Sequence, residues 1–133
     1  MRFTTPGRKA AVVAVLVAIS ALLTLLFDAL HSEAGSIVLT VLQVIAWYLA
    51  SRLFRGPGEP VQQARPWWRM TSRPLLSGAF AAVYGVLAVV NIGFSFAGFW
   101  SLSGTVSILA ELVLAALFAV SYRRLASLAR ATA

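Results

Sequence analysis

The sequence predicts an all-α fold: a polytopic membrane protein with a bundle of four transmembrane helices and both termini in the cytoplasm. Three observations predict it. Of the 133 residues, 60% are hydrophobic and 11% are charged, and the mean hydropathy is +0.87, far above what the surface of a soluble domain tolerates. Four apolar segments each approach the roughly 20 residues that a helix needs to cross a bilayer. All eleven Lys and Arg residues lie on one side of these segments, which orients the chain.

We expect spans over about residues 10–30, 37–54, 75–94 and 102–122, so that residues 1–133 form a single transmembrane domain. The first span begins like a signal peptide, after Arg8 and Lys9. Its apolar run is long enough to cross the membrane, which favours a retained helix. A polar break from Asp28 to Ser36 then turns the chain on the outer face.

The only sizeable loop, residues 55–74, falls on the cytoplasmic side. Two Gly and two Pro among its first six residues predict a flexible, non-helical start. Its second half alternates Trp and Arg, which suits a segment in the headgroup layer. The expected lipid contacts are Arg65, Trp67, Trp68, Arg69 and Arg73. Anchoring is the preferred interpretation, and the alternative is a grip on a lipid phosphate by the arginines.

The last two spans are joined by residues 95–101, an uncharged connection with three aromatic residues. Beyond the fourth span, the tail from Arg123 to Ala133 either continues the helix along the inner membrane surface or frays. The two halves share a layout of helix, outer turn with Gly and Ser, and helix with one strongly polar residue, Gln43 or Glu111. The sequence leaves open whether this is a repeat about an axis along the membrane normal.

Polar side chains within the spans mark the interior of the bundle, because each must face protein or water. At about 100° per residue, every helix carries them on one face. On the first two spans they are Ser20, Thr24, Asp28 and His31, then Ser36, Thr40, Gln43, Trp47 and Ser51. On the last two they are Ser77, Tyr84, Asn91 and Ser95, then Ser103, Ser107, Glu111 and Ser121. For Ser and Thr, helix packing is the preferred explanation.

Glu111 is the residue that packing explains least well. It lies about eight residues, or roughly 12 Å, from the outer end of its span, where a carboxylate is costly. If the polar faces meet, they enclose an outward-opening pocket with Glu111 as its floor. The expected lining is Glu111, Gln43, Asn91, Asp28, His31 and Tyr84. Glu111 would bind a proton, ion or small cationic solute there; alternatively, it fixes the helix register as a protonated side chain or faces another subunit.

The sequence argues against several kinds of chemistry. The absence of cysteine excludes disulfides, thiolate metal sites and cysteine nucleophiles. One histidine with scattered carboxylates lacks the spacing of a standard metal site, so no metal and no cofactor are expected. No catalytic triad, phosphate-binding glycine loop or pair of catalytic carboxylates can be assembled, and we expect no enzyme. The net charge is +7, and the basic residues lie next to the membrane segments. This placement indicates anionic lipids as partners, with no nucleic acid.

The leading functional hypothesis is a transporter- or channel-type protein that passes a small solute or ion through the polar pocket. We expect it to work as a homo-oligomer or within a larger membrane complex. Arg outnumbers Lys ten to one, which is typical of a high-GC bacterial genome and indicates a bacterial inner membrane. One alternative is an accessory or scaffold subunit of a larger membrane complex, and another is a lipid-headgroup-binding protein or enzyme. No sequence motif chooses among the three.

Overall fold

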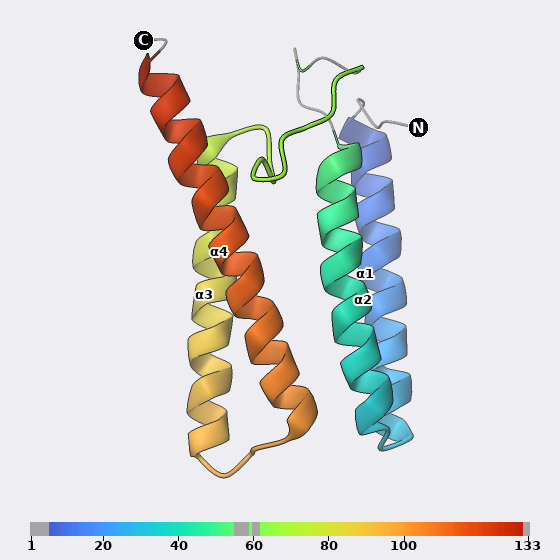
Figure 1. Ribbon diagram of the computed structural model, residues 1–133. Coiled ribbons are helices and arrows are strands. Elements are labelled where there is room, and N and C mark those ends of the chain that lie inside the picture. Colours follow the sequence, from blue (N-terminus) through green and yellow to red (C-terminus); the bar gives the residue numbers. More distant parts are fainter. Residues whose placement is uncertain (1–5, 55–58, 60–61, 132–133) are drawn as a thin grey trace. The chain divides into compact units, whose positions relative to one another are not determined.

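The computed structural model describes residues 6–54, 59 and 62–131 and contains four helices (Figure 1). They are α1 (Pro6–Ala29), α2 (Glu33–Leu53), α3 (Pro74–Phe96) and α4 (Leu102–Ala131). Each helix is long and apolar enough to cross a membrane, so the prediction of four such helices is confirmed. The chain divides into two compact units, Met1–Gln62 and Gln63–Ala133. Each unit contains one helical hairpin, α1 with α2 or α3 with α4, and is described by itself.

The helix ends differ from the expected spans for local reasons. α1 begins at Pro6. Proline suits the first turn of a helix, because the amide hydrogen that it lacks would have no partner in the helix there. α4 runs to Ala131, so the tail beyond Arg123 continues the helix. The flexible start expected for the loop at residues 55–60 lies outside the described residues, except for residue 59.

α1 ends in a Schellman motif, in which one residue in the left-handed conformation reverses the chain. His31 is that residue, with a φ of 51°. Its amide donates to the Asp28 carbonyl at 3.1 Å, and the Ser32 amide donates to the Phe27 carbonyl at 2.9 Å. His31 therefore has a structural part in the turn that its sequence position did not reveal.

α3 ends in the same motif, with Gly98 at a φ of 98°. The Gly98 amide donates to the Ser95 carbonyl at 3.3 Å, and the Phe99 amide donates to the Phe94 carbonyl at 3.1 Å. The rings of Phe94 and Phe99 meet edge to face with centroids 6.3 Å apart. This is the apolar contact that commonly accompanies the motif.

The second helix of each hairpin also begins in the same way, with a serine as its N-cap. Ser32 Oγ accepts from the Gly35 amide at 3.1 Å, and Ser101 Oγ accepts from the Gly104 amide at 2.9 Å. The cap at Ser32 starts α2 at Glu33, four residues before the predicted boundary, because a capped turn is helical even where it is polar. The turns of the two hairpins thus end the first helix and begin the second helix in the same way.

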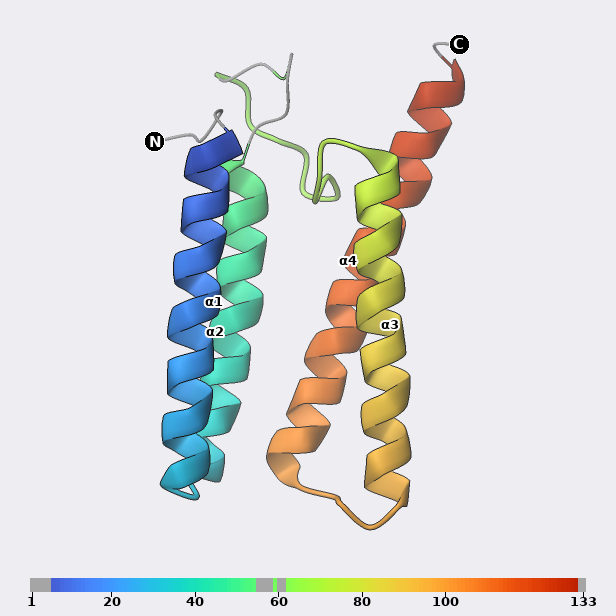
Figure 2. The ribbon, with the colours of Figure 1, turned by 180° about the vertical axis from the view of Figure 1, so that it is seen from behind.

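In the first hairpin, α1 and α2 run antiparallel side by side (Figures 1 and 2). At Gly35, an added Cβ atom would overlap the ring of Phe27. Only glycine fits at this position without displacing the aromatic ring, so Gly35 permits the tight return of α2 along α1.

In the second hairpin, α3 and α4 pack through an aromatic and aliphatic layer. The Phe118 ring stacks on Phe80 and Tyr84, with centroids 5.1 and 6.0 Å apart. Ala88 and Leu114 are buried beside it. Further along, Gly78 faces the ring of Tyr122. Small residues on α3 opposite large ones on α4 let the helices approach closely, which is the usual basis of packing between apolar helices.

Candidate functional site

The most polar contact inside the second hairpin joins α3 to α4 at Asn91 and Glu111. Asn91 Nδ2 donates to Glu111 Oε1 at 2.8 Å. Glu111 lies about 14 Å along the axis of α4 from its first residue, Leu102, at roughly 1.5 Å per residue. The polar faces that the sequence placed on these two helices therefore meet at this level.

The second oxygen of the Glu111 carboxyl group, Oε2, is buried and has no hydrogen-bond partner within the described residues. A carboxylate can accept about four hydrogen bonds, and burial with so few is costly. Tyr84 is the other polar group of α3 within electrostatic reach of Glu111. The carboxyl group is thus held by Asn91 on one oxygen, and its other oxygen has no hydrogen-bond partner among the described residues.

Apolar packing closes the hairpin on the side of Glu111 that leads toward the start of α3. Ala88, Leu114 and Phe118 are buried there, and the stacked rings of Phe80 and Tyr84 lie against Phe118. Between α3 and α4, Glu111 is therefore at the base of the polar region nearer the 97–101 connection. The outward-opening pocket with Glu111 as its floor stays a prediction.

The six predicted pocket residues are divided between the hairpins. Tyr84, Asn91 and Glu111 belong to the second hairpin, where Asn91 and Glu111 are in contact. Asp28 and His31 lie at the end of α1 and in the turn of the first hairpin, where His31 Nδ1 is 3.3 Å from the Ala29 carbonyl. Their membership in one pocket with Glu111 stays a prediction. Among the described residues, no three His, Cys, Asp or Glu side chains gather closely enough to hold a metal ion.

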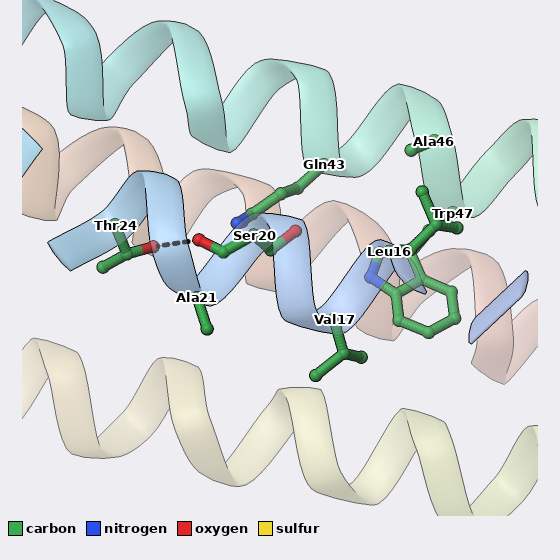
Figure 3. Close-up of a pocket in the computed structure, with 8 residues that line it drawn as sticks. All are labelled: Leu16, Val17, Ser20, Ala21, Thr24, Gln43, Ala46 and Trp47. Carbon is green, nitrogen blue, oxygen red and sulfur yellow. Dashed lines mark hydrogen bonds between the residues drawn. The ribbon is translucent and has the colours of Figure 1, made fainter. Parts of the chain in front are cut away.

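Gln43 lines a groove of about 310 Å³ between α1 and α2. In Figure 3, its side chain reaches from α2 toward Ser20 on α1. Thr24 donates its hydroxyl hydrogen to the Ser20 carbonyl at 2.9 Å, and Trp47 lines the same groove. The remaining lining residues are Leu16, Val17, Ala21 and Ala46. The groove joins the polar faces predicted for the first two spans, and it contains no charged side chain.

A buried hydroxyl cluster forms where α3 begins. Ser77 and Ser121 are both 0% exposed, and Ser77 Oγ donates to Ser121 Oγ at 2.9 Å. Thr71 Oγ1 lies 2.6 Å from Ser77 Oγ. The Met70 amide donates to Ser121 Oγ at 3.1 Å. These bonds fasten the segment before α3 to α4, across 51 residues of sequence.

The expected lipid-contacting residues occupy different environments in this segment. Arg65 is only 7% exposed, and its Nη1 donates to the Met70 carbonyl at 3.3 Å. Arg69 is half-buried, whereas Arg73 and Trp67 are exposed. The residue that sequence reasoning missed is Arg124, whose guanidinium carbon lies 5.8 Å from the Trp67 ring and 5.4 Å from the Trp68 ring. The only signal for it was its position after the fourth span.

No known protein family, curated protein or solved structure matches the chain.

Proposed function

We propose that the protein is a membrane transporter- or channel-type protein in which Glu111 binds a proton or small cation at Oε2. The observation that carries this proposal is the half-satisfied carboxyl group: Asn91 holds Oε1, and Oε2 is buried with no partner in the described part of the chain. In an apolar helix pair a bare carboxylate is strongly disfavoured, so a positive charge bound at Oε2 stabilises it. A bound proton and a bound cation meet this need equally well.

The pairing with Asn91 supports a binding site over a purely structural acid. A structural glutamic acid would gain most from two hydrogen bonds, one at each oxygen, because both oxygens are buried polar atoms. Here the Asn91 amide orients the carboxyl group and leaves the second oxygen available. Oε1 can accept the bond from Asn91 in either protonation state of the group, so a proton at Oε2 can be exchanged without breaking this contact.

A carbodiimide experiment tests this site directly. Dicyclohexylcarbodiimide is soluble in membranes and reacts with protonated carboxyl groups in apolar surroundings, so we expect it to modify Glu111 of the protein in liposomes. Asp28 and Glu33, which are exposed, should instead react with a water-soluble carbodiimide. Mass spectrometry of peptides gives the modified residue. If Glu111 stays unmodified by the membrane-soluble reagent while Asp28 and Glu33 react, the proposed proton site is wrong.

We also propose that the chain lies in a bacterial inner membrane with both termini in the cytoplasm. The support is the distribution of its eleven basic residues, because basic residues next to spans stay on the cytoplasmic side. Cysteine residues introduced at Ala34 and Ala97, which are exposed near the outer turns, should react with an impermeant maleimide on whole cells. A cysteine introduced at Gln62 should react only after permeabilisation. Labelling of the Gln62 variant in intact cells would contradict this orientation.

A second candidate is an accessory subunit of a larger membrane complex. The observation that favours it is the groove between α1 and α2, where the Gln43 amide and the Trp47 indole join two hydroxyl residues, Ser20 and Thr24, among apolar side chains. Such groups associate helices within membranes. The two candidates differ in their prediction for Glu111, since only the transporter needs its carboxyl group for ion flux.

A further inference from the structure

We infer that the end of the second hairpin where α3 begins is a preformed binding site for the phosphate of an anionic phospholipid. Its central residues are Arg124 of α4 and the two indoles, Trp67 and Trp68. Arg73 and Arg123 add positive charge at the same end. This site is separate from the Glu111 carboxyl group and does not depend on ion transport.

The segment that carries the two indoles is fixed in place by hydrogen bonds. The Arg69 amide donates to the Pro66 carbonyl at 3.0 Å, which makes Trp67 and Trp68 the central residues of a turn. One residue later, the buried Met70 amide is held by Ser121 of α4. A site whose parts are already ordered loses less entropy when it binds a ligand.

Arg124 lies against both indoles. Its guanidinium carbon is within 6 Å of both ring centroids, the range in which a cation is attracted to an aromatic ring. A contact of this kind is not a hydrogen bond, so the N–H groups of the guanidinium can still donate to a ligand. Arginine N–H pairs match the geometry of phosphate oxygens.

The second hairpin carries an excess of positive charge. Residues 63–133 contain six arginines and one acidic residue, Glu111. Glu111 lies about 20 Å from Arg124 along α4, at roughly 1.5 Å per residue. Within the described residues 63–131, no Asp or Glu side chain is therefore close enough to neutralise Arg73, Arg123 or Arg124, all of which are exposed. A surface of this kind attracts a phosphate anion.

The depth of Arg124 and Trp67 relative to a bilayer identifies the source of the phosphate as a lipid. The distance along α4 from Leu102 to Arg124 is about 33 Å, close to the roughly 30 Å thickness of a bilayer core. If α4 crosses the membrane, Arg124 reaches headgroup depth. Trp67 is 57% exposed beside it, and an exposed indole is most stable at the same depth. A soluble phosphate compound would leave this apolar ring in water.

The test measures how closely each type of lipid approaches the two indoles. The full-length protein, with Trp47→Phe and Trp100→Phe so that only Trp67 and Trp68 fluoresce, is placed in vesicles of phosphatidylcholine and phosphatidylglycerol. Either lipid can carry bromine atoms, which quench tryptophan fluorescence at short range. We expect brominated phosphatidylglycerol to quench more strongly than brominated phosphatidylcholine at equal bulk fraction.

Matched variants separate a site from general attraction. Arg124→Gln should lower the preference for phosphatidylglycerol by about fivefold, the effect of one basic residue near an anionic surface. Arg130→Gln removes the same charge two turns farther along α4 and should leave the preference within about twofold of the parent. Arg124→Lys should retain part of it, since lysine keeps the charge and loses the paired N–H groups.

Two results would overturn the proposal. Equal quenching by the two brominated lipids would mean that the indoles anchor the chain without a phosphate site. Equal losses in the Arg124→Gln and Arg130→Gln variants would mean diffuse electrostatic attraction. Addition of glycerol phosphate to the vesicles distinguishes the source: we expect no change in quenching, and a loss would indicate a site for soluble phosphate compounds.

Discussion

We expect Glu111→Gln to reduce ion flux through reconstituted vesicles to the level of vesicles without protein. Glutamine has nearly the same shape as glutamic acid, and its carbonyl oxygen can still accept the hydrogen bond from Asn91. It cannot bind a proton or a cation at the second position. The substitution therefore removes the proposed chemistry and preserves the observed contact between α3 and α4.

The measurement uses proteoliposomes loaded with a pH-sensitive or a sodium-sensitive dye, with the flux driven by a potassium diffusion potential. Glu33→Gln is the matched control, because Glu33 is an exposed acid in the first turn of α2 and its replacement should leave the flux unchanged. Thermal denaturation in detergent checks that each variant is folded. If the parent protein carries neither protons nor sodium ions while Glu111→Gln dissociates an assembly, the transporter proposal fails and the accessory-subunit proposal gains.

The largest effect on stability is expected from Ser121→Val. Ser121 Oγ accepts hydrogen bonds from both the Met70 amide and the Ser77 hydroxyl group, and the side chain is completely buried. Valine leaves the buried Met70 amide without its acceptor, and the Ser77 hydroxyl group keeps only Thr71 Oγ1 as a partner. Valine also adds volume to a fully buried site. Each buried unsatisfied donor costs about 1–3 kcal/mol, and overpacking adds about 1–3 kcal/mol. The segment before α3 should therefore detach from α4.

Limited digestion with trypsin reports this detachment at one peptide bond. Trypsin does not cleave before proline, so Arg65 and Arg73, which precede Pro66 and Pro74, are resistant. The bond between Arg69 and Met70 is the cleavable one in this segment. It is protected in the parent because Met70 is buried and its amide is bonded. Since cleavage requires local opening, we expect it to be about tenfold faster or more in Ser121→Val.

Ser127→Val is the control for this experiment. Ser127 is on the same helix, is exposed, and donates only to the Arg124 carbonyl one turn earlier. We expect trypsin to cleave the Ser127→Val variant after Arg69 at the same rate as the parent protein. Equal cleavage rates in the parent and both variants would contradict the role of Ser121 in holding the segment before α3 against α4. Because the indoles are carried by the same segment, Ser121→Val should also weaken the preference for anionic lipid.

The sequence alone predicted the elements that depend on local composition. Four apolar runs gave four helices of sufficient length, since a helix satisfies its own backbone hydrogen bonds and needs only apolar side chains to be stable in lipid. Angular spacing also placed Asn91 and Glu111 on polar faces of α3 and α4. The boundaries were less accurate, because the serine cap at Ser32 and the left-handed His31 act through single hydrogen bonds that hydropathy does not register.

The tertiary structure decided which of these polar residues meet. Asn91 faces Glu111 only because the turn at Gly98 and the Phe118 packing set the antiparallel register of α3 and α4. The contact between Met70 and Ser121 spans 51 residues, and no periodicity within one helix predicts such a pair. The same contact makes the segment before α3 part of the second hairpin and places its two indoles beside Arg124. Local sequence specifies which face of a helix is polar; only the packing of one helix on another specifies the partner of each polar group.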